Sequence, residues 1–174
     1  MFDFKSLIRN VENFPIEGIV FRDITTLLKD PKGLKNALDK LYNASKDLKI
    51  TKVIGIESRG FILGGALAEK LGAGFVPIRK PGKLPAETVS ETYILEYGTD
   101  TIEMHKDAIE KGDRILVHDD LLATGGTMNA ACKLIEKMGG EIVQLSFLIE
   151  LSFLNGREKL KEYDIFSLVN YYSE

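Results

Sequence analysis

The sequence predicts an α/β fold with a mostly parallel sheet and helices on both faces. Short apolar segments rich in Val and Ile alternate with longer segments whose apolar residues recur at helical spacing. Polar and charged residues gather directly after several of the apolar segments, where strands would end. The carboxyl ends of parallel strands lie at one edge of the sheet, where open α/β proteins bind ligands. These two observations predict both the fold class and the place of a site.

Composition narrows the functional classes. The chain has 174 residues, of which 44% are hydrophobic and 28% charged, with a net charge of −3. A chain of this size suits one domain, residues 1–174, and can bury about 70% of its unfolded surface. The negative charge argues against a nucleic-acid partner. No apolar run approaches the roughly 20 residues of a membrane span. The first residues lack a signal-peptide core, so the expected location is the cytoplasm.

The first third of the chain predicts a helix, a loop, a strand and a second helix. Residues 3–13 are predicted as a short helix with four apolar residues on one face: Phe4, Leu7, Ile8 and Val11. Pro15 and Gly18 bracket a loop before an extended apolar segment at residues 19–21, which on its own suggests an edge strand. The helix after the turn at residues 30–33 has apolar residues at i, i+3, i+4 and i+7: Leu34, Ala37, Leu38 and Leu41.

Two further strands are each followed by cationic side chains. Residues 53–56 form a buried strand by composition and lead into Glu57-Ser58-Arg59-Gly60-Phe61, after which a helix ends at Gly72. Arg59 alone is most simply a surface charge, but at a strand end it could clamp an anion bidentately. Residues 75–78 predict a third strand, which is followed by Arg79, Lys80 and Lys83 among Pro and Gly. Such a loop is usually exposed and flexible, and it also suits a lid.

The next segments predict a β-hairpin with Gly98 near its turn, because residues 92–98 and 101–104 partly alternate between apolar and polar. On sequence alone, Glu96 in this hairpin is most simply a solvated strand charge. Later strands are predicted at residues 142–149 and 165–169. The single cysteine, Cys132, excludes an internal disulfide and is predicted to pack inside a helix.

Residues 115–127 carry the strongest functional pattern. An apolar strand ends in Asp119 and Asp120, and a turn of small residues, Ala123-Thr124-Gly125-Gly126-Thr127, leads into a helix. Main-chain N–H groups at such a helix start converge on an anion, and the helix dipole adds roughly half a positive charge. Adjacent carboxylates would repel a phosphate but can accept hydrogen bonds from two vicinal hydroxyls. Phosphate donors beside diol acceptors describe a ribose-5-phosphate site, although a plain tight turn with solvated aspartates would also fit the residues.

The same stretch matches neither the dinucleotide fingerprint nor the P-loop. Its sequence Asp119-Asp120-x-x-Ala123-Thr124-Gly125-Gly126-Thr127 resembles the phosphoribosyl pyrophosphate (PRPP) motif of type I phosphoribosyltransferases. The resemblance implies that family's fold, with a small N-terminal hood at residues 1–30 and a flexible β-hairpin flap at residues 80–105. It also implies that Asp119 and Asp120 hold the ribose hydroxyls, while residues 123–127 hold the 5′-phosphate.

Residues 14–24, which contain Phe-Pro-x-x-Gly-Ile-Val-Phe-Arg-Asp-Ile, are similar to the base-binding hood of the adenine-specific members of that family. By this resemblance the backbone of Val20 faces the Watson–Crick edge of adenine, Phe21 supports the ring, and Arg22 lies near N1. A backbone carbonyl and a backbone N–H can pair with N6 and N1 of adenine. Hypoxanthine would leave these buried groups unpaired, which can discriminate by up to about 10⁴-fold.

Two more segments resemble parts of the family's site. Glu57-Ser58-Arg59-Gly60-Phe61 resembles its pyrophosphate loop, which often contains a non-proline cis peptide. The resemblance implies that pyrophosphate is bound by the residues of this loop and of the following cationic loop: Ser58, Arg59, Arg79, Lys80 and Lys83. Ser90-x-Thr92-Tyr93-x-Leu95-Glu96-Tyr97-Gly98 is similar to the family's flexible catalytic loop. There Tyr93 closes over the site, and Glu96 approaches the imidazole ring of adenine and moves its proton.

The resemblance implies transfer of the 5-phosphoribosyl group from PRPP to adenine, giving AMP and pyrophosphate by inversion at C1′. It implies Mg²⁺ held mainly by substrate oxygens and water, with Asp119 and Asp120 in the outer shell and no direct protein ligand. It also implies a homodimer. Two alternatives stay open: a phosphoribosyltransferase for hypoxanthine, guanine or xanthine, and a non-catalytic PRPP-binding regulator. His118 stands where the family usually has an apolar residue, and we assign chemistry neither to it nor to His105.

Overall fold

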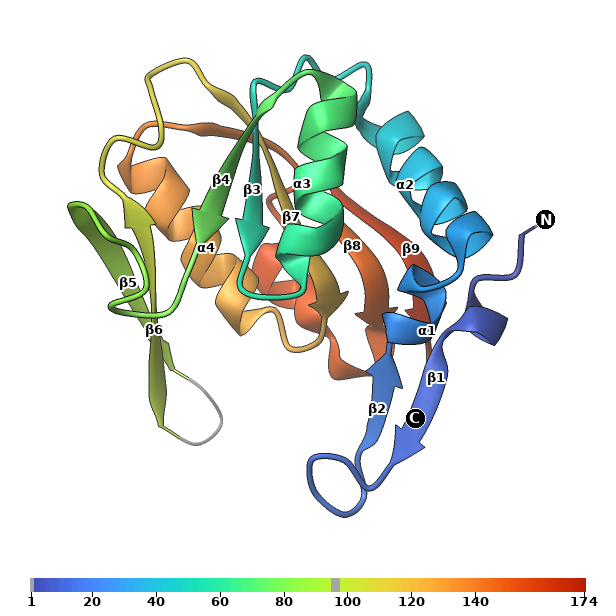
Figure 1. Cartoon of the computed structure of the whole chain (residues 1–174). Helices are drawn as coiled ribbons and strands as arrows, with labels where there is room; N and C mark the ends of the chain where they lie inside the picture. The colour runs from blue at the N-terminus through green and yellow to red at the C-terminus, as the bar shows by residue number, and fades with distance from the viewer. Residues whose placement is uncertain (1, 95–97) are drawn as a thin grey trace.

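A parallel five-stranded sheet forms the centre of the molecule (Figure 1). The computed structural model describes residues 2–94 and 98–174. The strands lie in the order β4-β3-β7-β8-β9, and every neighbouring pair is parallel. Their bounds are β3 Lys52–Ile56, β4 Gly74–Ile78, β7 Arg114–Leu122, β8 Glu141–Leu151 and β9 Ile165–Tyr171. The predicted fold class is therefore confirmed.

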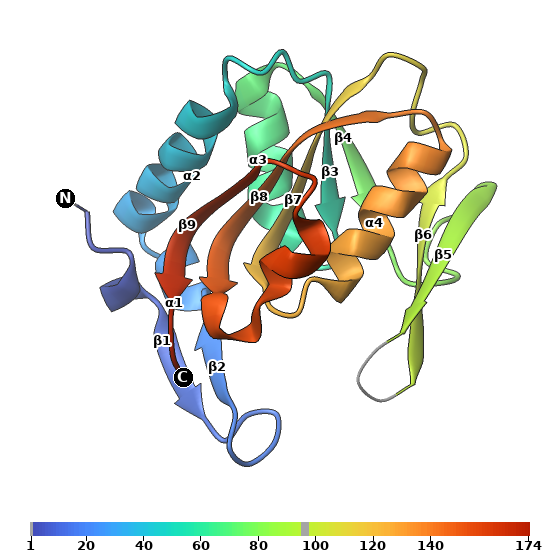
Figure 2. The same ribbon diagram turned by 180° about the vertical axis from the view of Figure 1, so that it is seen from behind.

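Helices cover both faces of this sheet. Helices α2 (Pro31–Ser45) and α3 (Gly60–Leu71) lie on one face, and α4 (Gly126–Lys137) lies on the other (Figures 1 and 2). Successive strand side chains point to opposite faces, so each strand supplies both apolar layers. In β7, Leu116 packs in the cluster that contains residues of α2 and α3, while Val117 packs in the cluster that contains residues of α4. Strands buried on both faces explain the nearly continuous apolar segments in the sequence.

The strand order brings the polar strand ends together. β3 has β4 on one side and β7 on the other, although β4 follows β3 in the chain and β7 comes much later. The polypeptide thus leaves β3 in one direction and later builds the sheet in the other, which creates a crevice at the carboxyl ends. Glu57 and Arg79, which directly follow β3 and β4, meet Asp119 of β7 at this edge. The prediction that β7 ends in Asp119 and Asp120 is wrong, because pairing with β8 continues to Leu122.

Local sequence signals account for the ends of two helices. Asp30 caps α2, because its carboxylate accepts a hydrogen bond of 2.6 Å from the N–H of Gly33, and Pro31 occupies the first turn. Helix α3 ends at Gly72, whose φ of 67° is the left-handed conformation that suits glycine. Both helices and the predicted end of α3 at Gly72 are confirmed. The segment predicted as a turn at residues 30–33 is instead the cap and first turn of α2.

Two antiparallel hairpins extend beyond the carboxyl edge of the sheet (Figure 1). The hood hairpin consists of β1 (Arg9–Glu12) and β2 (Val20–Asp23), and the flap hairpin consists of β5 (Thr88–Ile94) and β6 (Thr99–His105). The short helix α1 (Thr25–Leu28) joins the hood hairpin to α2. Three 3₁₀ turns complete the described residues: Lys5–Leu7, Ser152–Leu154 and Gly156–Leu160.

The prediction of a helix over residues 3–13 is wrong. Only Lys5–Leu7 form a 3₁₀ turn, and the chain then enters β1, which pairs with β2. Arg9 donates a hydrogen bond of 3.0 Å from Nε to Oδ2 of Asp23, its cross-strand partner. Phe4 and Ile8 are buried as expected. Their burial is reached without a helix because the later strand β2 provides hydrogen-bond partners that the local pattern does not reveal.

None of the helices in residues 2–94 and 98–174 combines the length and apolar character needed to cross a lipid bilayer.

Candidate active site

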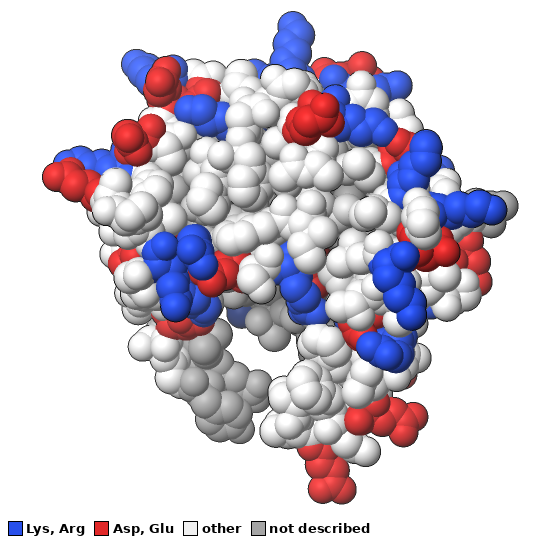
Figure 3. Space-filling model, viewed as in Figure 1, with Lys and Arg blue, Asp and Glu red and all other residues white. Residues whose placement is uncertain are grey.

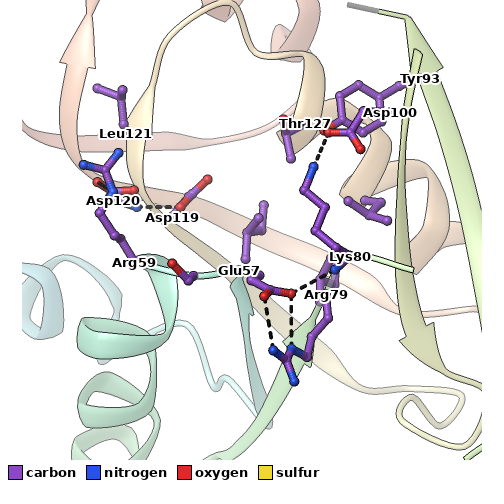
Figure 4. Close-up of a pocket in the computed structure, with 14 residues that line it drawn as sticks. Glu57, Arg59, Arg79, Lys80, Tyr93, Asp100, Asp119, Asp120, Leu121 and Thr127 are labelled. Atoms are coloured by element: carbon purple, nitrogen blue, oxygen red, sulfur yellow. Dashed lines mark hydrogen bonds and ion pairs between the residues drawn. The ribbon is translucent and has the colours of Figure 1, made fainter. Parts of the chain in front are cut away.

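A cavity of about 290 Å³ lies at the carboxyl ends of β3, β4 and β7 (Figure 4). The space-filling surface is hollowed at this edge, between the hood hairpin and the side where the flap hairpin lies, and Lys and Arg side chains border the hollow (Figure 3). The residues that line the cavity are Ile56, Glu57, Ser58, Arg59, Ile78, Arg79, Lys80, Tyr93, Asp100, Ile102, Asp119, Asp120, Leu121 and Thr127. Most of the polar residues that the sequence singled out at strand ends are therefore in one place.

A smaller cavity of about 80 Å³ adjoins the first and is lined by the turn between β7 and α4. Gly125 at the helix start has a φ of 76°, and a Cβ there would stand 2.6 Å from the carbonyl oxygen of Gly156. Only glycine fits both conditions. Helix α4 begins without a capping side chain, so the N–H groups of its first turn are available to an anion. This turn has the shape that the sequence predicted for residues 123–127.

Asp119 lines both cavities, and Asp120 lines the larger one. The N–H of Asp120 donates a hydrogen bond of 2.8 Å to Oδ1 of Asp119, and Arg59 Nε lies 3.0 Å from Oδ2 of Asp120. Burial raises the pKa of Asp119 well above its usual range, and the negative charge of Asp120 raises it further. Burial also raises the pKa of Asp120, although the nearby Arg59 opposes this shift. Two adjacent enclosed carboxylates can accept hydrogen bonds from hydroxyl donors.

The loop after β3 contains a cis peptide bond between Glu57 and Ser58, as the family resemblance implied. Glu57 receives hydrogen bonds of 3.2 and 3.1 Å from Nε and Nη2 of Arg79, and one of 2.9 Å from the main-chain N–H of Lys80. The hydrogen bond from Arg79 is the main reason that the pKa of Glu57 is lowered. Glu57 therefore holds the loop after β4 beside the loop after β3, a role that sequence reasoning missed although the residue stood in the quoted motif.

The cations assigned to pyrophosphate differ in their placement. Arg59, Arg79 and Lys80 line the cavity, and Ser58 lies among them. Lys83 is exposed, does not line this cavity, and contributes its backbone carbonyl to a hydrogen bond of 3.1 Å from Nη1 of Arg79. The structure thus brings Ser58, Arg59, Arg79 and Lys80 together at the cavity and leaves the Lys83 ammonium outside it.

A series of hydrogen bonds connects the flap hairpin to both sides of the cavity. The Thr127 hydroxyl donates a hydrogen bond of 3.0 Å to the hydroxyl of Tyr93. The Tyr93 hydroxyl in turn donates a hydrogen bond of 3.0 Å to Oδ2 of Asp100. Lys80 forms an ion pair with the same Asp100 oxygen (Figure 4). Tyr93 was expected at the site, whereas Asp100 was missed. Its only sequence signal is a position across the predicted hairpin from Tyr93. Glu96, the predicted proton-transfer residue, lies outside the described residues.

The hood hairpin contributes Phe21 but turns Arg22 away. The Arg59 guanidinium lies 5.0 Å from the centroid of the Phe21 ring, and Phe14 packs edge-on against Phe21 at 5.2 Å. Arg22 is buried: its guanidinium lies 4.2 Å from the centroid of the Tyr171 ring, and its Nη1 donates 2.6 Å to Oδ1 of Asn10. Phe21 is thus beside the cavity, while Arg22 supports the hairpin from the side of the core.

His118 and Cys132 are buried groups without contact to the cavity. His118 Nδ1 lies 3.3 Å from the Ser146 hydroxyl, and burial lowers the pKa of His118 to about 4. Burial raises the pKa of the Cys132 thiol to about 12, which agrees with the predicted packing role. In the part of the protein that the structure describes, no group of three or more His, Cys, Asp or Glu side chains is arranged to hold a metal ion. Asp119 and Asp120 are the only adjacent carboxylates among the residues of the described cavity.

A nucleotide-like ligand would meet three features at this edge: an anion-binding turn, a pair of diol acceptors and a cluster of cations. This fold and this site define a phosphoribosyltransferase, and residues 23–171 match the family model described as the phosphoribosyl transferase domain. The adenine phosphoribosyltransferase of Solibacter usitatus is 60% identical over 97% of this chain and 98% of its own. The chain belongs to the adenine phosphoribosyltransferases.

Solved structures agree with this membership. The adenine phosphoribosyltransferase from Thermoanaerobacter pseudethanolicus superimposes with a TM-score of 0.94 at 51% identity, covering 97% of this chain and 98% of that one. The APRTase from Giardia lamblia complexed with 9-deazaadenine gives a TM-score of 0.93 at 41% identity, covering 98% of this chain and 97% of that one.

Proposed function

We propose that this protein transfers the 5-phosphoribosyl group of PRPP to adenine, giving AMP and pyrophosphate. The observation that carries the proposal is the junction of β7 and α4, where Asp119 and Asp120 near the end of β7 are followed, after a short turn, by the uncapped, glycine-bearing helix start. A carboxylate pair and an anion-binding turn at this spacing suit the diol and the 5′-phosphate of one ribose. The adenine analogue bound to the similar Giardia lamblia enzyme supports the choice of base.

The ribose and its phosphate occupy the junction in this proposal. The main-chain N–H groups of residues 123–127 and the Thr124 and Thr127 hydroxyls bind the 5′-phosphate. Asp119 and Asp120 accept hydrogen bonds from the two ribose hydroxyls, and their negative charge stabilises the positive charge that develops at C1′ in an oxocarbenium-like transition state. Arg59 leaves Asp120 when a diol takes its place, and it is then free to bind the leaving group.

Arg59, Arg79 and Lys80 bind the departing pyrophosphate, together with Ser58. Lys83 contributes through its carbonyl, which accepts a hydrogen bond from Arg79. Each of the three cavity cations adds a charge-assisted hydrogen bond to oxygens whose charge grows as the bond to C1′ breaks. Arg79 is oriented for this by Glu57, which holds its guanidinium through two nitrogens. Inversion at C1′ follows because pyrophosphate leaves toward the cations while the base enters from the side of the hood hairpin.

Adenine lies against Phe21 and pairs with the main chain of Val20. Arg22 serves the base indirectly, because its guanidinium is held by Tyr171 and by Asn10 of β1, its cross-strand partner. Tyr93 covers the site from the flap hairpin. Glu96, a residue outside the described part of the protein, stays the sequence-based choice for removing the purine proton. Residues 1–174 act as one domain in this proposal, with residues 1–30 as hood and 80–105 as lid.

The protein atoms at this site can supply only some of the ligands that Mg²⁺ needs. The cavity offers two adjacent carboxylates, one of them paired with Arg59, and Mg²⁺ commonly binds one or two carboxylates together with substrate phosphates and water. Asp119 and Asp120 would therefore hold it through water, and when bound it neutralises charge on the pyrophosphate. A homodimer and a cytoplasmic location stay predictions.

One assay tests the proposal. Purified protein is incubated with PRPP, Mg²⁺ and one purine at a time, and the nucleotide product is quantified. We expect AMP from adenine and little product from hypoxanthine, guanine or xanthine. A preference for hypoxanthine would contradict the main-chain pairing at Val20. No nucleotide from any purine, together with retention of a promoter DNA probe, would instead favour a PRPP-binding regulator.

A further inference from the structure

Asp100 is a cavity carboxylate to which the proposed reaction assigns no role. It lies on β6 of the flap hairpin, directly across from Tyr93 in the strand register, and it lines the cavity. Its Oδ2 accepts the Tyr93 hydroxyl at 3.0 Å and forms the ion pair with Lys80, and its Oδ1 accepts the N–H of Thr101 at 2.8 Å. The carboxylate thus satisfies one group from each of three segments of the protein.

Lys80 and Tyr93 are groups that a bound substrate would need. Lys80 is a pyrophosphate cation in the proposed function, and Tyr93 connects Asp100 to Thr127 at the start of α4. All three cations that line the described cavity are already paired with a carboxylate: Arg59 with Asp120, Arg79 with Glu57, and Lys80 with Asp100. Glu57 also fixes the main chain of Lys80, and Asp120 faces the diol, so both have a second use. Asp100 has no comparable second use, because its side chain serves to hold Lys80 and Tyr93.

We propose that Asp100 is a positioning residue that stands in for a phosphate group of pyrophosphate before substrate binds and is displaced when pyrophosphate or PRPP arrives. The inference rests on the proposed function and deepens it. Asp100 keeps Lys80 at the cavity and keeps Tyr93 against Thr127, so the flap hairpin is already joined to both sides of the cavity in advance. Binding then exchanges one anion for another, and the same exchange releases the Tyr93 hydroxyl.

The exchange of Asp100 for a phosphate group lowers the affinity for pyrophosphate and PRPP, and this loss of affinity can be measured. The hydrogen bond from Lys80 is the main cause that lowers the pKa of Asp100, so the carboxylate is ionised at neutral pH. A negative charge in contact with Lys80 competes with an incoming anion for that ammonium and repels it at short range. Asp100 should therefore weaken the binding of pyrophosphate and PRPP, and so speed the release of pyrophosphate. AMP, which does not reach Lys80 in the proposed site, should be affected little.

The test compares Asp100→Asn with Glu91→Gln. Glu91 lies on β5 of the same hairpin and forms an ion pair with Lys137 outside the cavity, so its change removes the same charge and the same type of contact. Titration calorimetry with inorganic pyrophosphate and Mg²⁺ should show that Asp100→Asn lowers the Kd by at least about fivefold, since charge pairs at this range are worth about 1 kcal/mol or more in partly exposed sites. Glu91→Gln and the charge-conserving Asp100→Glu should stay within about twofold of the unchanged protein.

Steady-state kinetics separate this role from a purely structural one. Asp100→Asn should lower the KM for PRPP, leave the KM for adenine and the Kd for AMP within about twofold, and strengthen inhibition by pyrophosphate. A Kd for pyrophosphate that is unchanged or raised, or that falls equally in Glu91→Gln, overturns the inference. If the unchanged protein forms no AMP, the proposed function has failed, whereas normal AMP formation with an unshifted pyrophosphate Kd means that only the role of Asp100 has failed.

Discussion

The two ends of the cavity are built from different parts of the protein. At the end proposed to bind the 5′-phosphate (the phosphate end), the turn between β7 and α4 offers main-chain N–H groups, and Gly125 fits against the carbonyl of Gly156. At the end proposed to bind pyrophosphate (the pyrophosphate end), the cavity wall consists of charged side chains that are paired with one another, such as Arg79 with Glu57 and Lys80 with Asp100. One end is a fixed shape, and the other is a set of exchangeable ion pairs.

This difference predicts how each end responds to substitution. A main-chain site loses binding when its backbone shape changes, because its donors carry no net charge that could be rebalanced. A site made of paired side chains changes its affinity when the charge of one partner changes, and it can do so in either direction. Asp100→Asn, which should tighten pyrophosphate binding, tests the second statement. The following predictions test the first and the boundary between them.

Gly125→Ala should have the largest effect, at the phosphate end. Its φ of 76° and the 2.6 Å approach of a Cβ to the Gly156 carbonyl oxygen force the turn to move. We expect AMP affinity to fall by at least about tenfold, equivalent to about 1.4 kcal/mol. Titration calorimetry with AMP measures this, with pyrophosphate titrated in parallel to show that the other end is less affected.

Gly112→Ala is the matched control for that change. Gly112 also has a positive φ, 95°, but a Cβ there would meet nothing within 4 Å, and it lies in the turn before β7, far from the carboxyl edge. It should cost about 1 kcal/mol of unfolding free energy and leave AMP affinity unchanged. If the two alanine variants bound AMP equally well, the close fit of Gly125 would not be what shapes the phosphate site.

Asp119→Asn tests the boundary between the two ends and should have opposite effects on activity and stability. It removes a charged acceptor for the ribose diol, so kcat/KM should fall by about tenfold or more. Burial and Asp120 raise the pKa of Asp119, so the folded protein binds more protons than the unfolded chain above about pH 4, and stability falls as the pH rises through this window. Asn mimics the protonated acid, so the unliganded variant should be more stable than the unchanged protein at pH 7.

Urea unfolding at pH 7 and pH 4 in magnesium-free buffer measures this stability difference, which should shrink toward pH 4. Asp113→Asn is the control with the opposite sign. Burial opposes ionisation of Asp113, but hydrogen bonds led by that from Lys52 hold its pKa below the usual value. Its stability contribution is present at pH 7 and lost in acid, so Asp113→Asn should destabilise at pH 7. An Asp119→Asn protein that is less stable than the unchanged protein at pH 7 would show that this carboxylate is not an electrostatic burden.

The sequence predicted the elements that form the phosphate end well, and those that form the pyrophosphate end only in part. Strands, helices and the turn at residues 123–127 follow from local apolar spacing, glycine and the order of the segments, so they were visible without the fold. Asp100 was not, because its role depends on the register that sets it opposite Tyr93 and on the approach of Lys80 from the loop after β4. Glu57 was missed for the same reason, since its partner Arg79 follows a neighbouring strand.

The hood shows the same limit. β1 was predicted as part of a helix because Phe4, Ile8 and their neighbours have helical spacing, and only the pairing with β2 decides otherwise. Arg22 was placed near the base by resemblance, but its guanidinium is held by Tyr171, near the opposite end of the sequence. Contacts between segments far apart in sequence thus decide where a charged side chain points, even when its motif is recognised.

His118→Leu should have the smallest effect on the site and a defined effect on acid stability. His118 lies in β7 directly before Asp119, but its ring faces Ser146 and lies on the side of α3, where a Cβ on Gly64 would come within 3.6 Å of it. A leucine of similar size should therefore leave AMP affinity within about twofold. The unfolded chain takes up a proton near pH 6.5, whereas burial holds the pKa of His118 at about 4 in the folded protein. Stability is thus lost as the pH falls below about 6.5.

Between pH 7 and pH 5 the unchanged protein should lose about 2 kcal/mol more unfolding free energy than His118→Leu, as urea unfolding at each pH would show. Other titrating groups are common to both proteins, so the difference isolates His118. Equal losses would mean that the buried ring accepts a proton in the folded state, through Ser146 or through water reaching its second nitrogen.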